Sequence, residues 1–158
     1  MSVIDIQARQ AAADALTRFF IRRDTSNFQY MDQYPHSKDP AIRSIWWMLW
    51  GLYDDLREHK MVEQHALWPD TLELVNRCVL FLESGREYEW DSRVFSLRRA
   101  VRAWVRFLQR LPERRRPLTA SEQLEEILFD EPQGDASVWP FYRKADYEEL
   151  QQRSLVGH

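Results

Sequence analysis

Three tryptophans within five residues, Trp46, Trp47 and Trp50, constrain the fold of this chain more than any other feature. At about 100° per residue, the surrounding apolar side chains form one helical stripe roughly 120° wide. The members of this stripe are Ile42, Ile45, Trp46, Leu49, Leu52, Tyr53 and Leu56. Trp47 projects from the opposite side, among polar neighbours. The pattern predicts a helix with a buried stripe, and a Trp47 that lies at the surface or contacts a partner.

Helical periodicity recurs along the chain, whereas strand patterns are nearly absent. Helix starts are indicated by Ser2, by Asp39 followed by Pro40, and by Asp70 with Glu73, and Gly85 indicates a helix end. We expect helices at about residues 3–23, 39–60, 70–85, 92–111 and 119–129, and a last helix from after Tyr142 to about residue 153. The fold class is therefore all-α: a single-domain bundle of five or six helices that spans residues 1–158.

The segment between the first two expected helices, residues 24–38, reads as a long loop rich in aromatic residues. Asp24, Thr25, Ser26 and Asn27 are residue types that stop a helix. The loop then carries Phe28, Tyr30, Met31 and Tyr34. These side chains either pack back on the body of the protein or form a recognition surface.

The helix expected at residues 70–85 has little polar face, which predicts a central position in the bundle. We expect Val75, Val79 and Leu82 to be fully buried. Cys78, the single cysteine, lies in the same apolar run and has no intramolecular disulfide partner. We interpret it as a small buried hydrophobic residue.

Charge is strongly segregated although the net charge is only −3. Residues 93–116, from Arg93 to Arg116, contain nine arginines and one acid, whereas residues 120–135 contain six acids and no base. Within the basic segment an arginine stripe follows one helix face, and its members are Arg99, Arg102, Arg106 and Arg110. The stripe fits a solvated face that pairs with the acidic block, an acidic protein partner, or a phosphate backbone. The net negative charge disfavours nucleic acid.

Signatures of catalysis and of nucleotide binding are absent from the sequence. The best metal candidates are Asp55, His59 and Glu63, spaced four apart, with His65 nearby. Metal centres on helices usually need matching ligands on a second helix, and no such pair occurs. We therefore expect no metal and no cofactor, and we interpret His59 as a favourable charge at a helix C-terminus.

The sequence also bears on location. Its N-terminus lacks a basic region followed by an apolar stretch, and its longest apolar run, from Ile45 to Tyr53, is nine residues long. A membrane-spanning helix requires about 20 apolar residues. We expect a cytoplasmic protein without a membrane segment.

These observations favour a small non-enzymatic domain that binds a protein, such as an immunity protein, an antitoxin or an adaptor. The partner-binding candidates are Trp47, Phe28, Tyr30, Tyr34, Arg99, Arg102, Arg106 and Arg110. An acidic protein or a second copy of the chain fits these residues as a partner. The alternatives are a nucleic-acid-binding protein that uses residues 93–116, and an enzyme with an unrecognised carboxylate and histidine site.

Overall fold

The computed structural model describes residues 3–90 and 134–156, which contain five α-helices and no strand. The helices are α1 (Ile6–Leu16), α2 (Asn27–Gln33), α3 (Pro40–Trp50), α4 (Pro69–Ser84) and α7 (Lys144–Val156). The expected all-α class is confirmed. None of these described helices is both long and apolar enough to cross a membrane. The helices expected at residues 92–111 and 119–129 lie outside the described residues.

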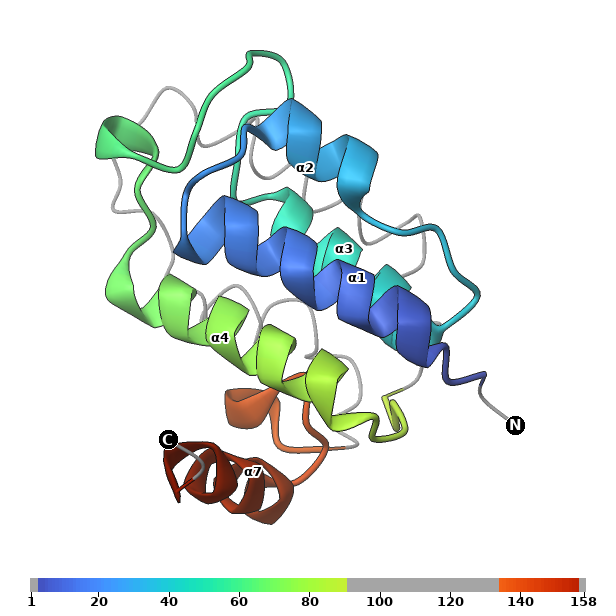
Figure 1. Ribbon diagram of the computed structural model, residues 1–158. Helices are drawn as coiled ribbons and strands as arrows, with labels where there is room; N and C mark the ends of the chain where they lie inside the picture. The colour runs from blue at the N-terminus through green and yellow to red at the C-terminus, as the bar shows by residue number, and fades with distance from the viewer. Residues whose placement is uncertain (1–2, 91–133, 157–158) are drawn as a thin grey trace.

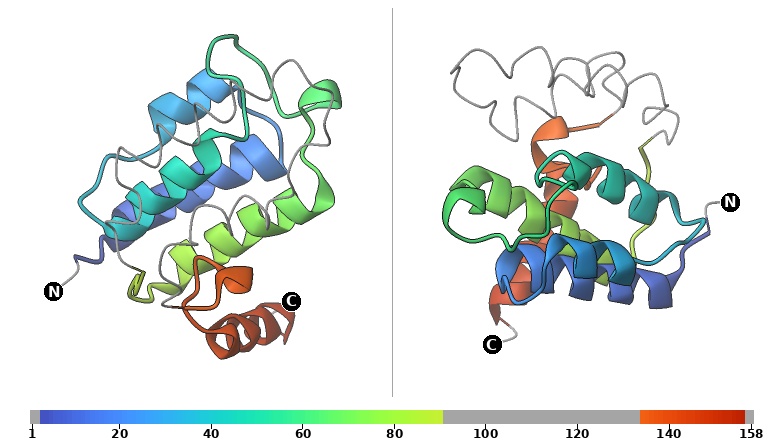
Figure 2. Two further views of the ribbon diagram at one scale, coloured as in Figure 1. Left: turned by 180° about the vertical axis from the view of Figure 1, so that it is seen from behind. Right: turned by 90° about the horizontal axis from the view of Figure 1, so that it is seen from above.

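The first four helices pack around a shared apolar core. In Figure 1, α1 lies between α2 and α4, and α3 runs behind it. The view from behind in Figure 2 places α3 in front of α1, which confirms the layering. The C-terminal helix α7 lies beside α4, away from α2. The buried side chains of α1, α3 and α4 therefore face one another and form one core.

Side-chain caps decide where α1 and α3 begin. The Asp39 carboxylate accepts a hydrogen bond from the Ala41 amide at 2.9 Å, with Pro40 in the first turn, as the sequence predicts. The start of the first helix was expected at Ser2, and this is wrong. Asp5 is the N-cap instead, because its carboxylate accepts from the Ala8 amide at 3.0 Å. That bond and one from the Ser37 hydroxyl lower the pKa of Asp5.

A wide π-helical turn at Thr17–Ile21 follows α1. Its hydrogen bond joins the Arg22 amide to the Thr17 carbonyl at 2.8 Å, five residues back. Phe19 and Phe20 are neighbours in the sequence, yet both are fully buried. The turn thus brings two adjacent rings into the same core before the chain leaves the helix at Arg23, which is left-handed.

Residues 24–38 were expected to be a long loop, but they contain the seven-residue helix α2. Ser26 accepts from the Gln29 amide at 3.3 Å, and the Gln29 side chain accepts from the Ser26 amide at 2.9 Å. This reciprocal pair is a capping box, and it satisfies two amides that the helix start would leave unpaired. The polar residues that suggest a helix stop therefore also start the next helix.

Helix α3 ends at Trp50, about ten residues before the expected end, so this boundary prediction was wrong. The side chain of Asn27 explains the early end, because it donates to the Asp54 and Arg57 carbonyls at 2.7 and 3.0 Å. It also accepts from the His59 amide at 2.8 Å. Backbone groups that would bond within a longer helix thus bond to α2. Leu56, expected in the buried stripe, is 85% exposed.

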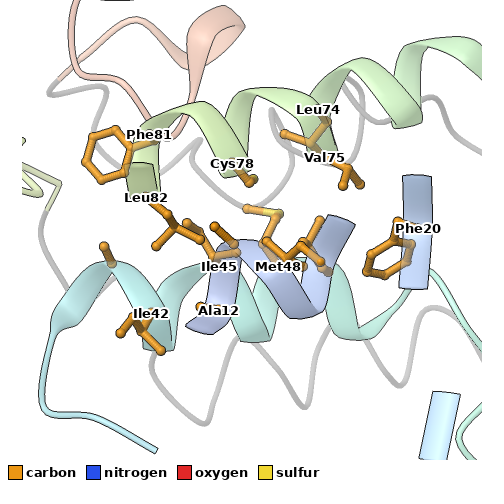
Figure 3. Packing of buried hydrophobic residues seen from close by; sticks show 14 of the residues in the cluster. Ala12, Phe20, Ile42, Ile45, Met48, Leu74, Val75, Cys78, Phe81 and Leu82 are labelled. Carbon is orange, nitrogen blue, oxygen red and sulfur yellow. The ribbon is translucent and has the colours of Figure 1, made fainter. Parts of the chain in front are cut away.

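Helix α4, which its apolar character predicts to be central, packs against α1, α3 and α7 but keeps one face exposed. It ends at Gly85, whose φ of 64° is left-handed, and this confirms the predicted stop. The capping box expected at Asp70 is absent, since that carboxylate accepts from the adjacent Thr71 amide. Val75 and Leu82 are buried as expected, but Val79 is only partly buried. Figure 3 shows Leu74, Val75, Cys78 and Leu82 in the space between α4 and the facing helices.

Residues 86–90, which follow α4, form hydrogen bonds with the C-terminal part of the chain. Tyr88 and Trp90 are buried between exposed acids. The Trp90 indole donates to the Phe141 carbonyl at 3.2 Å, and the Trp139 indole donates to the Tyr88 hydroxyl at 3.2 Å. On α7, Tyr147 and Leu150 pack against the core, as the sequence predicts.

A buried ion pair joins three helices. The Arg9 guanidinium makes two hydrogen bonds to the Asp39 carboxylate, at 2.6 and 3.1 Å, and both residues are buried. Arg9 also donates to the Arg86 carbonyl, and Asp39 accepts from the Asp5 amide at 3.0 Å. The start of α1, the cap of α3 and the end of α4 therefore share one polar network. Arg9 and Asp39 were not predicted from the sequence to pair.

Candidate functional site

Two tryptophans and one aspartate form a partly exposed cluster at the end of α3. The rings of Trp47 and Trp50 lie 5.2 Å apart between centroids and are inclined by 68°. The Trp50 indole nitrogen donates to Asp55 Oδ2 at 3.2 Å. Trp47 is 39% exposed, which agrees with its predicted place on the polar side of the helix. We call these three residues the tryptophan corner.

The early end of α3 brings Asp55 to this corner. Asp55 follows Trp50 by five residues, and a continuous helix would place their side chains on different faces. The clamp made by Asn27 instead turns residues 54–59 toward α2, and the Ser26 hydroxyl adds a 2.7 Å hydrogen bond to Glu58. The helical phase of α3 thus positions Trp47 and Trp50, and the tertiary contact with Asn27 positions Asp55.

The aromatic residues of α2 divide into one exposed residue and two buried ones. Phe28 is 39% exposed, so it remains a candidate for partner contact. Tyr30 stacks on Phe19 with ring centroids 4.8 Å apart, and the Tyr34 hydroxyl donates to the Ile42 carbonyl at 2.9 Å. Both tyrosines are buried. The prediction that Tyr30 and Tyr34 contact a partner was therefore wrong. Because α2 turns them inward, both belong to the core.

The arginine stripe is the other predicted binding feature. Its four residues, Arg99, Arg102, Arg106 and Arg110, lie outside the described part of the chain. Among the described residues, Trp68 is an exposed tryptophan on another element, directly before α4, and it is 68% exposed. A substitution of Trp68 can therefore serve as a control for the same substitution of Trp47.

The metal candidates are distributed over the loop after α3. Asp55 binds Trp50, as above, while His59 stacks on His65 with ring centroids 4.1 Å apart. His59 lies in the loop, so its expected role at a helix C-terminus is wrong. Its Nδ1 donates to the Arg57 carbonyl at 2.8 Å. Within residues 3–90 and 134–156, no three His, Cys, Asp or Glu side chains come close enough to hold a metal ion.

Four buried polar atoms of residues 25–59 have no hydrogen-bond partner in the described part of the chain. They are Thr25 Oγ1, Tyr30 Oη, Tyr53 Oη and His59 Nε2. Tyr30 and Tyr53 pack edge to face at 5.7 Å, and burial raises the pKa of both hydroxyls. The two phenols therefore stay protonated at neutral pH and are poor general bases.

Cys78 lies at the centre of the core and is the one nucleophilic thiol of the chain. Burial raises its pKa well above the usual range, so the reactive thiolate is scarce. We expect no reaction with a thiol reagent such as DTNB in the folded protein at pH 8, and one equivalent released after unfolding in guanidinium chloride. Rapid reaction of the folded protein, measured by absorbance, would contradict this burial.

The fold places this chain in the broad class of all-α helical bundle proteins. No protein-family model, no curated protein and no solved structure matches it.

Proposed function

We propose that this chain is a non-enzymatic cytoplasmic domain that binds a protein partner through the tryptophan corner. The observation that carries the proposal is the exposure of Trp47, a large ring that packs on Trp50 but is not enclosed by the core. Tryptophan is among the residues that most often dominate binding energy at interfaces. Phe28, exposed on α2, is a further contact candidate.

The protonation of the candidate reactive groups favours protein binding over catalysis. Burial raises the pKa of the Cys78 thiol and of the Tyr30 and Tyr53 hydroxyls, which keeps all three protonated. Protonated thiols and phenols are weak nucleophiles and weak bases. A stoichiometric binder such as an immunity protein, an antitoxin or an adaptor needs only a preformed surface. In this proposal an acidic patch of the same partner pairs with the arginine stripe.

The test is the effect of Trp47→Ala on binding. A partner is first isolated by affinity capture from the native host and purified, and its affinity is then measured by calorimetry. Because removal of a central aromatic anchor commonly costs 2 kcal/mol or more, we expect the affinity to fall about 30-fold or more. The fold should survive, since Trp47 lies at the surface.

Trp68→Ala is the matched control, because it removes the same side chain from an exposed site on another element. We expect it to change the affinity by less than about threefold, as most interface and surface positions do. Equal affinities for wild type and Trp47→Ala would refute the tryptophan corner as the binding site.

A further inference from the structure

We propose that the tryptophan corner receives a cationic side chain, arginine or lysine, of the protein partner. This inference rests on the proposed function and adds the chemistry of the group that the corner binds. Cations are attracted to the faces of aromatic rings, and tryptophan is the strongest such ring among the side chains. The 68° inclination of Trp47 to Trp50 keeps the two rings from covering each other face to face, so ring surface remains for a ligand.

Asp55 supplies the negative charge beside the rings. Its Oδ2 atom accepts from the Trp50 indole at 3.2 Å, which holds the carboxylate against the corner. The carboxylate of Asp54, the preceding residue, accepts a hydrogen bond from the Leu56 amide at 2.8 Å. No arginine, lysine or histidine in the described part of the chain forms an ion pair with either carboxylate. Their charge is therefore available to a cation from outside.

Elsewhere the protein covers aromatic rings with its own arginines. Arg9 lies over Phe81 at 5.5 Å, Arg77 over Tyr147 at 6.0 Å and Arg143 over Tyr142 at 5.9 Å. Within residues 3–90 and 134–156, no cationic side chain lies over Trp47 or Trp50.

The corner thus combines two attractive features for one cation: exposed indole surface, and a carboxylate that has no ion-pair partner among residues 3–90 and 134–156. A guanidinium group fits both, because it stacks on aromatic faces and donates to carboxylate oxygens. An acidic side chain at the same place would be repelled by Asp55. Charge complementarity therefore selects a basic residue of the partner for this corner.

The experiment titrates the protein with N-acetylarginine amide and with N-acetylcitrulline amide, which has a similar shape without the charge. Binding is followed by the indole N–H signals in NMR spectra, assigned with Trp47→Phe and Trp50→Phe. We expect the arginine probe to shift the signals of Trp47 and Trp50 with an affinity about three- to tenfold higher than that of the citrulline probe. Equal responses to the two probes would overturn the proposal.

Asp55→Asn tests the carboxylate, and Asp32→Asn on α2 is the control because it makes the same change at another exposed aspartate. We expect Asp55→Asn to remove the preference for arginine and Asp32→Asn to keep it. A preference that survives Asp55→Asn in a folded variant would overturn the proposal. So would concentration-dependent shifts of Trp47 in the absence of probe, because these would assign the corner to a second copy of the chain.

The purified partner separates failure of this inference from failure of the proposed function. If Trp47→Ala loses the partner while Asp55→Asn binds with unchanged affinity, protein binding stands and the cationic occupant is wrong. If neither variant changes the affinity, the corner is not the binding site. Loss of affinity in both variants, with Asp32→Asn unchanged, supports the two proposals together.

Discussion

Asp39→Asn is expected to lower the free energy of unfolding by about 3–5 kcal/mol, because it leaves the buried Arg9 guanidinium without its counter-charge. Asparagine keeps the size of the side chain and can still cap α3, so the loss reports mainly on the charge. Urea denaturation followed by circular dichroism measures it. This is a large share of the total stability of a domain of ordinary size.

Asp24→Asn is the control for that experiment. Asp24 also pairs with arginines, at 3.4 Å from Arg18 and 2.9 Å from Arg22, but this cluster is solvent-exposed. We expect its loss to cost about 0–1 kcal/mol. The double variant Arg9→Met with Asp39→Asn should regain part of the stability, since no uncompensated charge stays buried. Equal stability of Asp39→Asn and wild type would show that the pair does not support the fold.

Leu82→Ala is expected to cost about 2–5 kcal/mol, because Leu82 is buried where α4 faces α1 and α3 and its removal leaves a cavity. Thermal and urea unfolding measure the change. From the sequence alone, Leu80→Ala is predicted to cost as much. The structure separates the two positions, since Leu80 is only partly buried and packs at the edge of the core.

Leu80→Ala is therefore the matched control, two residues away on the same helix and with the same atoms removed. We expect its cost to be clearly smaller than that of Leu82→Ala. If both variants melt like wild type, α4 is not the central helix. If Leu80→Ala is the more destabilising of the two, α4 turns a different face to the core than the structure shows.

Local signals predicted two helix boundaries correctly. Asp39 and Pro40 start α3, and Gly85 ends α4, because capping bonds and a left-handed residue act within one turn of the chain. The start of α2 was missed although its signal, Ser26 followed by Gln29, is also local. That signal could have been found, since a serine with glutamine three residues on is a capping box.

The candidate site was predicted in part. The exposure of Trp47 follows from helical phase, which sequence carries directly. The inward direction of Tyr30 and Tyr34 does not, because it depends on which face α2 turns to α1 and α3. The place of Asp55 beside Trp50 could not be predicted either, since it requires α3 to end at Trp50.

By itself the sequence determined the helical class, the stripe of Ile42, Ile45 and Leu49, and the surface position of Trp47. Only the tertiary structure decided the end of α3 and the partner of Arg9. Both depend on side chains distant in the sequence: Asn27 takes the backbone bonds of residues 54–59, and Asp39 neutralises a guanidinium thirty residues away. Periodicity encodes which face of a helix is buried, whereas a hydrogen bond between distant segments exists only once packing has brought them together.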